Sequence, residues 1–417
     1  MLAKNRVAFS VIAGAIILIA AIAAIFWARG FKPNLKNGSI DRTGLIVATS
    51  TPTGAQVFLD DRLTSATNTN IGYLDPKTYK IRIEKDGYTT WAKEIDVKAD
   101  LATEIKALLF PVAPEIKPLS ATGATSPVLS PDGGQIAYGV SGERGGAYVL
   151  SMADRPFPFR QDVRQLVPNK GTIDYSKATF IWSPDSNQII ARIKGANDQI
   201  TSNLLLDASK SNQQPNDITA SLNATISDWQ QQINTKSQTQ VISIPDEVKS
   251  ATQAAQTASP SPSPSPKLNT KSPAIQQFNN STIQLDYYPS GLILSPDEEK
   301  VLYKTKDNKY KVYDLKAKKE YTLPDFSDFI NISWYPDSAH LVVAQKDIIS
   351  IIEADGLNKM VVFSGKFENA CPPSATASSG CGRGFVFAHP SGTRLIILTT
   401  LTQPEGSPPN LYSINLR

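Results

Sequence analysis

Carboxylate side chains recur at one kind of position along this chain of 417 residues. At five places between two apolar runs, an aspartate or a serine follows a proline, and these are Pro131-Asp132, Pro184-Asp185, Pro296-Asp297, Pro336-Asp337 and Pro390-Ser391. Carboxylates that come together from separate repeats are suitable ligands for a hard cation. The structural interpretation is that proline presets φ for a turn while the Asp or Ser side chain accepts a hydrogen bond from a backbone N–H. We favour the turn, and therefore predict structural roles for these residues and no metal site.

Few other side chains offer reactive chemistry. Cys371 and Cys381 are the only cysteines, and His340 and His389 are the only histidines. In an oxidising compartment the cysteines are candidates for a disulfide that closes a small loop, and two unrelated free thiols are the alternative. Two thiols without nearby histidines do not make a zinc site with four ligands. His389 occupies the turn position that serine or tyrosine holds elsewhere, so we expect a structural role for it.

The sequence lacks several well-known catalytic motifs. It contains no Gly-x-Ser-x-Gly nucleophile motif, no phosphate-binding glycine loop and no His-Glu-x-x-His motif. Those motifs carry nucleophilic catalysis, phosphate binding and zinc-dependent hydrolysis, respectively. We therefore predict no catalytic residues and no cofactor.

Short apolar strands must position the repeated turns. Val128-Leu129 precedes the first turn and Ile136-Ala137 follows it, and comparable runs rich in Val, Ile and aromatic residues flank the others. Successive prolines of the turns lie 53, 112, 40 and 54 residues apart. Because a propeller blade of four strands takes about 40 to 50 residues, the longest interval must contain an insertion.

This pattern resembles the repeats of TolB-like propellers, relatives of the WD-repeat family, in which the Ser-Pro-Asp turn joins the two inner strands of a blade. The resemblance covers residues 114–417 and implies about five blades, while a sixth around residues 281–287 stays open. Residues 116–120 have the pattern of a lone strand, and the chain ends on a third strand without a fourth. We therefore expect 116–120 to close the ring as the outer strand of the last blade.

The insertion lies between residues 221 and 280. Ile226, Trp229 and Ile233 fall on one face of a helix, so the sequence predicts a short amphipathic helix there. Pro245 is placed to begin a second helix. The Ser/Pro tract within 257–273 has nothing to bury, so we interpret this tract as a disordered excursion on the propeller rim. For the tract we favour an inert spacer over O-glycosylation or a proline-recognising partner.

An uncharged, largely apolar segment, 7–27, follows a short tail, 1–6, that carries Lys4 and Arg6. As a helix this segment would span about 31 Å, close to the thickness of the hydrocarbon core of a bilayer. We predict a transmembrane helix with a cytoplasmic N-terminus, and a cleaved signal peptide is the alternative. The run is longer than a signal core and ends on Trp27, a residue typical of the membrane interface, which favours the uncleaved anchor. A polar stalk, 28–42, follows.

Residues 43–112 have the pattern of a compact β module. Residues 79–83 alternate strictly between apolar and charged side chains, as a half-buried strand does. The segment resembles the PEGA domain, a small β-sandwich found in many prokaryotic envelope proteins. The resemblance rests on the turn at 50–55, which has Pro-Thr-Gly-Ala where the family has Pro-Glu-Gly-Ala, on the strand at 57–60, and on the Leu74-Asp75-Pro76 and Gly87-Tyr88 segments. It implies a structural or adhesive module rather than an active site.

Composition narrows the class of partner. The chain carries 42 basic and 38 acidic residues without a Lys/Arg cluster interleaved with aromatics, so a nucleic-acid partner is not expected. The sequence therefore predicts an all-β protein anchored in the cell membrane through 7–27, with its domains outside the cytoplasm, that binds an envelope protein or glycan and no small-molecule cofactor. The alternatives are an enzyme with its site in the central channel of the propeller, and a TolB-like role in an envelope complex.

Overall fold

The computed structural model describes residues 2–28, 31–34, 39–153, 163–195, 199–241, 244–250, 292–368, 385–401 and 407–417. Strands predominate among them, so the prediction of a mainly β chain is confirmed. The chain divides into two compact units, Met1–Val112 and Ala113–Arg417, each with a core of its own.

The first unit begins with helix α1, Leu2–Ala28, which contains the transmembrane segment predicted at 7–27. Within the described part of the chain, no helix is both long and apolar enough to cross a membrane. The transmembrane assignment is therefore not supported by the structure and stays a prediction. Strands β1, Phe31–Asn34, and β2, Ser39–Arg42, pair as an antiparallel hairpin. The stalk expected at 28–42 is thus partly a hairpin. Pro33 is compatible with this pairing, because each strand of a two-stranded ribbon has one unpaired edge, where a missing N–H is tolerated.

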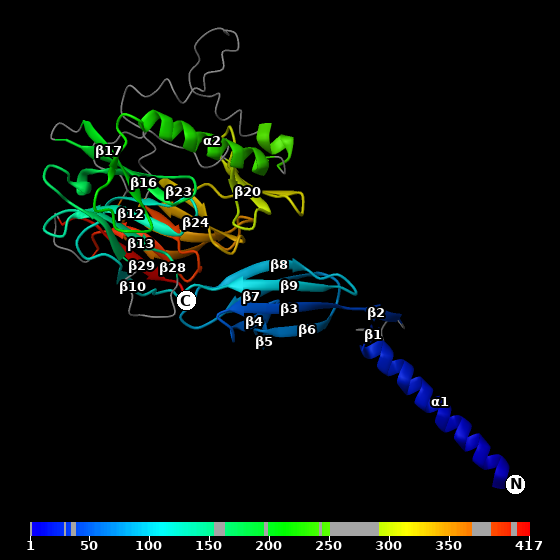
Figure 1. Cartoon of the computed structure of the whole chain (residues 1–417). Helices are drawn as coiled ribbons and strands as arrows, with labels where there is room; N and C mark the ends of the chain where they lie inside the picture. The colour runs from blue at the N-terminus through cyan, green and yellow to red at the C-terminus, as the bar shows by residue number, and fades with distance from the viewer. Residues whose placement is uncertain are drawn as a thin grey trace. The chain divides into compact units, whose positions relative to one another are not determined.

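The rest of the first unit is a β-sandwich (Figure 1). One sheet has the order β6-β3-β9 and the other the order β5-β4-β7-β8. The strands are β3 Gly44–Thr51, β4 Gln56–Leu59, β5 Arg62–Ala66, β6 Thr69–Leu74, β7 Thr78–Glu84, β8 Trp91–Asp96 and β9 Ala102–Leu108. Buried residues alternate with more exposed ones along β3 and β7, so one face of each sheet contributes to a shared core around Ile46, Val57, Ile81 and Trp91. The predicted small β-sandwich is confirmed.

Four-stranded antiparallel sheets make up the second unit (Figure 1). Four of the five consist of consecutive strands. The first two comprise β11 Thr125–Leu129, β12 Gln135–Val140, β13 Gly146–Ser151 and β14 Val163–Pro168, and then β15 Thr179–Trp182, β16 Gln188–Lys194, β17 Ile200–Asp207 and β18 Asn216–Asp217. The next two comprise β19 Ile293–Leu294, β20 Lys300–Lys304, β21 Tyr310–Asp314 and β22 Lys319–Thr322, and then β23 Phe329–Trp334, β24 His340–Gln345, β25 Ile348–Glu353 and β26 Met360–Ser364. The predicted turn joins the first two strands of each sheet.

The fifth sheet joins the two ends of the second unit. Its order is β10-β29-β28-β27, with β10 Ile116–Pro118, β27 Val386–Ala388, β28 Arg394–Thr399 and β29 Asn410–Asn415. β10 pairs antiparallel with β29, so that Ile116 lies opposite Ile414. The predicted closure by residues 116–120 is therefore confirmed.

Apolar clusters link neighbouring sheets, which is how blades pack around a ring. One cluster joins β12 to β14 with β15 to β17, a second joins β20 and β21 with β23 to β25, and a third joins β12 and β13 with β28 and β29. Two tryptophans cross such interfaces in the same way. Trp182 Nε1 donates to the carbonyl of Val128, and Trp334 Nε1 donates to the carbonyl of Ile293, each at 3.0 Å.

Helix α2, Leu222–Val241, belongs to the insertion and lies beside the sheet of β15 to β18 (Figure 1). Ile226, Trp229 and Ile233 are buried against this sheet, at 2%, 4% and 5% exposure, in a cluster with Ile190 of β16. The predicted amphipathic helix is confirmed.

The segment that follows α2 also packs into the propeller. Ile244 and Val248 are buried in a cluster with Val301 and Tyr303 of β20. The described part of the insertion thus lies against the sheets on either side of it. This packing arises because each of the two sheets has an apolar face that other side chains must cover. The Ser/Pro tract at 257–273 and the open sixth blade at 281–287 lie outside the described residues.

Candidate functional site

The repeated turns are held by the same hydrogen bonds in three blades. Ser130 Oγ donates to Asp132 Oδ1 at 2.5 Å, and that carboxylate also accepts from the N–H of Gly134 at 2.9 Å. Ser130 Oγ in turn accepts from the N–H of Gln135 at 2.9 Å. The turns that contain Asp185 and Asp297 repeat all three bonds. Each carboxylate therefore bonds within its own turn.

Three turns also bond to the turn of the preceding blade, and two of them do so through a serine hydroxyl; in the third, the Tyr335 hydroxyl donates to the carbonyl of Gly392. Ser186 Oγ accepts from the N–H of Asp132 at 3.2 Å, and Ser338 Oγ accepts from the N–H of Asp297 at 3.0 Å. Reasoning from the sequence missed this contact between blades. The pattern that marks it is a serine directly after Pro-Asp, which occurs in these two turns alone.

Both histidines lie in turns. His340 Nδ1 lies 2.7 Å from Asp337 Oδ2. Burial on its own would raise the pKa of Asp337, but hydrogen bonds from the His340 ring and from backbone N–H groups outweigh it and hold this pKa below its usual value. His389 Nδ1 lies 2.7 Å from Ser391 Oγ, and its Nε2 lies 2.8 Å from Arg394 Nη2. Both rings are nearly fully buried and bonded to their own turns.

The remaining predicted residues fall into two groups. The prolines each begin a turn between the first two strands of a sheet, and they are Pro131, Pro184, Pro296, Pro336 and Pro390. Cys371 and Cys381 lie outside the described residues, so their disulfide stays a prediction. Within the described ranges, no three His, Cys, Asp or Glu side chains are grouped closely enough to hold a metal ion.

The strand before the repeated turn lies at one edge of each of the five described sheets; these strands are β11, β15, β19, β23 and β27, and none of them carries a charged side chain. Their half-buried polar residues include Thr125, Thr179 and Asn331. General acid–base catalysis requires titratable groups, and these five strands supply none.

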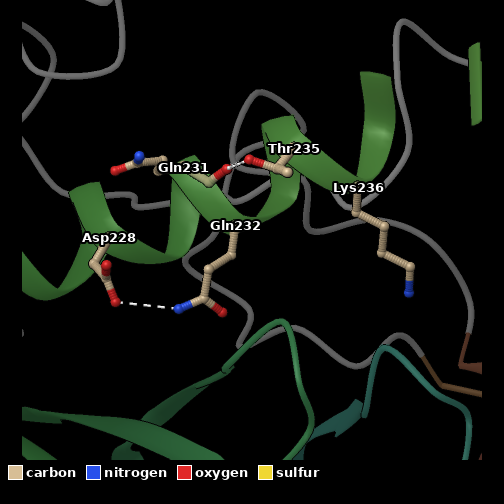
Figure 2. A pocket seen from close by; sticks show the side chains of 5 residues that line it. All are labelled: Asp228, Gln231, Gln232, Thr235 and Lys236. Carbon is tan, nitrogen blue, oxygen red and sulfur yellow. Dashed lines mark hydrogen bonds between the residues drawn. The ribbon is translucent and has the colours of Figure 1, made fainter. Parts of the chain in front are cut away.

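A hollow of about 530 Å³ borders α2 (Figure 2). Its described lining comes entirely from this helix and consists of Asp228, Gln231, Gln232, Thr235 and Lys236. All five side chains are exposed. Gln232 Nε2 donates to Asp228 Oδ2 at 3.1 Å, and Thr235 Oγ1 donates to the carbonyl of Gln231 at 2.9 Å.

The spacing of polar residues explains why α2 presents this lining. Asp228, Gln232 and Lys236 are four residues apart and share one side of the helix. The apolar stripe that ends at Ile233 lies about a quarter turn away around the helix and packs against the sheet. Amide and hydroxyl groups both donate and accept hydrogen bonds, and Asp228 and Lys236 add one charge of each sign to the lining. Reasoning from the sequence missed it because an exposed polar helix face is usually only solvated.

Comparisons with known proteins bear on both units. A family model described as the PEGA domain matches residues 43–112. Among the curated proteins, no match was found. One similar solved structure is a putative TolB from Agrobacterium tumefaciens, with 11% identity, 74% of this chain and 73% of that chain covered, and a TM-score of 0.21.

Two further solved structures are similar at the same low level. An oligogalacturonate lyase from Vibrio parahaemolyticus has 7% identity, with 81% of this chain and 86% of that chain covered and a TM-score of 0.28. A β-propeller domain from Myceliophteria thermophila has 12% identity, with 67% of this chain and 64% of that chain covered and a TM-score of 0.18. The propeller assignment rests on the strand pairing of this chain itself. Residues 43–112 therefore form a PEGA domain, and the described residues between 113 and 417, with five four-stranded sheets closed by β10, form a β-propeller.

Proposed function

We propose that this is a membrane-anchored binding protein of the cell envelope, without catalytic activity, whose propeller binds an envelope glycan in the hollow beside α2. The PEGA domain serves as a structural or adhesive module between the anchor and the propeller. The observation that carries the proposal is the lining of the hollow, where two glutamines and a threonine accompany one acid and one base. Glycan hydroxyl groups pair with such amides and hydroxyls.

The hollow has a size suited to such a ligand. Small-molecule sites typically enclose about 300 to 1,000 Å³, and this one measures about 530 Å³. Because its five side chains are exposed, a ligand reaches them without displacing the packed core of the blade.

Two observations support the anchor. Residues 7–27 carry no charge. In α1, Phe9, Ile17 and Ile19 are 75%, 69% and 66% exposed, and a helix that is apolar on all sides requires an apolar environment. The resemblance to PEGA domains of prokaryotic envelope proteins supports an extracytoplasmic position for the rest of the chain.

Glycan binding is tested by co-sedimentation of the full chain, in detergent, with purified insoluble cell-wall glycan. The double variant Gln231→Ala with Gln232→Ala is expected to bind about tenfold more weakly, since two hydrogen bonds of about 0.7 kcal/mol each are lost. Asn234→Ala is the matched control, because it lies on α2 outside the described lining. Absence of glycan binding by the wild type, or an equal loss in the control, refutes the proposal. Recovery of a protein crosslinked at α2 instead would assign the hollow to a protein partner.

The anchor is tested by fractionation and by protease digestion of intact cells. Lysines placed at Ile16 and Ile19 should release the protein from the membrane fraction, because each charge costs about 3 kcal/mol at the centre of a helical span. The control variant Ile19→Leu should stay in that fraction. A wild-type protein found in the soluble fraction refutes the anchor, and digestion only after lysis refutes the outward orientation.

A further inference from the structure

A buried cation lies in the second blade of the propeller. Arg192 of β16 pairs with Asn203 of β17 and with Thr179 of β15. Arg192 is 9% exposed and Asn203 is 4% exposed. Side chains that oppose each other on paired strands project from the same face of the sheet, about 5 Å apart at Cβ.

The face that carries this pair is the one beside α2. Ile190 and Leu205 also oppose each other on β16 and β17, and both belong to the cluster with Trp229 of α2. Arg192 and Asn203 each lie two residues from this pair and therefore share its face. Here α2 takes the place that a neighbouring four-stranded sheet takes at the other interfaces.

Two polar atoms of this pair have no hydrogen-bond partner. They are Nε of Arg192 and Oδ1 of Asn203, and both are shielded from solvent. In the described part of the chain, no carboxylate acts on Arg192, and burial is the sole influence on its pKa. Each of these two buried polar atoms costs about 1–3 kcal/mol while it lacks a partner. A ligand that supplies both partners would recover that cost.

We propose that Arg192 and Asn203 form a binding site for a carboxylate that carries a neighbouring hydroxyl group. The guanidinium donates to the carboxylate oxygens, and Asn203 Oδ1 accepts from the ligand's hydroxyl. This site is distinct from the described lining of the hollow beside α2, and the proposal does not depend on glycan binding there.

Nε of Arg192 needs an acceptor and Oδ1 of Asn203 needs a donor, and a hydroxy-carboxylate supplies both. A guanidinium presents donors in a planar fork that matches a carboxylate, and the ion pair offsets the cost of burying the charge. Water would satisfy Asn203 without neutralising Arg192. A halide would neutralise Arg192 but offers no donor to Asn203. A hydroxy-carboxylate supplies both a negative charge and a hydroxyl donor.

Helix α2 packs on the face of the sheet that carries the site. Three buried side chains hold α2 to this face, which are Ile226, Trp229 and Ile233. Local opening of one helix costs less than separation of two sheets, so displacement of α2 is the expected entry route.

The test is isothermal titration calorimetry on the full chain in detergent, with glycolate, acetate, D-glucuronate and the neutral isostere glycolamide as probes. Wild type should bind glycolate about fivefold to tenfold more tightly than acetate, and should not bind glycolamide. Arg192→Met should lower the affinity for glycolate at least tenfold. Asn203→Leu should lower the affinity for glycolate to that for acetate and leave the affinity for acetate unchanged. Lys194→Met is the matched control, since Lys194 is the next cation on the same face of β16, and it should bind as wild type does.

The D-glucuronate arm identifies the source of the carboxylate. Tighter binding than glycolate assigns the site to a sugar acid, and weaker binding assigns it to a small hydroxy acid. The proposal is overturned if wild type binds no carboxylate, if Arg192→Met binds normally, or if Lys194→Met loses as much affinity.

A second readout separates a binding role from a structural one. Arg192→Met removes the unpartnered Nε and puts apolar atoms of similar length in its place, so ligand-free Arg192→Met should unfold at the wild-type temperature or above it. A clear fall in that temperature would make Arg192 a structural residue and overturn the proposal. Glycan co-sedimentation by the same variant should be unchanged, so failure of one proposal does not imply failure of the other.

Discussion

Ser120 connects the start of the propeller to its last strand. Its Oγ donates to Asn410 Oδ1 at 2.8 Å and accepts from the N–H of Leu411 at 3.0 Å, although serine and asparagine are 290 residues apart in sequence. All three residues are buried. The substitution Ser120→Ala removes both hydrogen bonds without introducing a larger side chain, and it therefore tests how much the closure of the ring contributes to stability.

The two losses are unequal. Asn410 Oδ1 keeps a second donor, the N–H of Gly123 at 2.8 Å. The N–H of Leu411 loses its acceptor, and a buried donor left without a partner costs about 1–3 kcal/mol. We expect the free energy of unfolding of the propeller to fall by about 2 kcal/mol. For a unit of this size, that corresponds to a drop of about 4 °C in the unfolding temperature.

Differential scanning calorimetry and urea titration of the full chain measure this change. The PEGA domain has a separate core, so its transition should not move and serves as an internal reference. Ser413→Ala is the control: Ser413 is buried in the same sheet, but its Oγ makes only a long contact of 3.4 Å to the carbonyl of Lys117. That variant should lose less than about 0.5 kcal/mol. Equal effects of the two variants would refute the argument that Ser120 stabilises the closure.

The tryptophans between blades should act independently: Trp182→Phe and Trp334→Phe should each lower the free energy of unfolding by about 1–3 kcal/mol, additively in urea titrations, because they lie in different interfaces. At pH values above the usual Asp pKa, near 4, Asp337→Asn should have a lower free energy of unfolding than the wild type. The depressed pKa of Asp337 means that this difference shrinks as pH falls further, which urea titrations from pH 7 to pH 3 would show. A difference that grows at low pH would contradict that sign. Trp229→Ala should cost about 3–5 kcal/mol of local stability and speed hydrogen exchange across residues 222–241 but not in β23 to β26; uniform exchange would contradict separate packing of α2.

Local turn chemistry made much of the propeller predictable from sequence. Pro-Asp turns depend on side chains within a few residues, so the first two strands of every sheet could be located from sequence alone. The closure by β10 followed from a count, since the last sheet lacked one strand and an unassigned strand lay at the other end. The PEGA domain was predictable because its strands alternate cleanly, as β7 does between Tyr79 and Ile83.

Features that depend on distant contacts were not predictable in this way. The stripe of α2 indicated an amphipathic helix, but no local pattern shows that its partner is the face of Ile190 rather than solvent. Arg192 looks like an ordinary polar residue within a strand, and its lack of a partner emerges only once Asn203 and the cover of the sheet are known. The hairpin of β1 and β2 was missed because Pro33 argues against a strand wherever pairing is needed on both edges.

The place of α2 accounts for the irregular spacing of the repeats. Each sheet of a propeller has two faces, and an apolar face left uncovered would be costly. Between β15–β18 and β19–β22 the facing surfaces are covered by α2 on one side and by Ile244 and Val248 on the other. The turns also differ at the insertion. Ser186 and Ser338 bond to the turn of a neighbouring sheet, whereas the turn that follows the insertion has Glu298 at this position. The described residues of the long interval therefore pack against the sheets on both sides of it, and α2 lies on the blade face that also carries the buried Arg192.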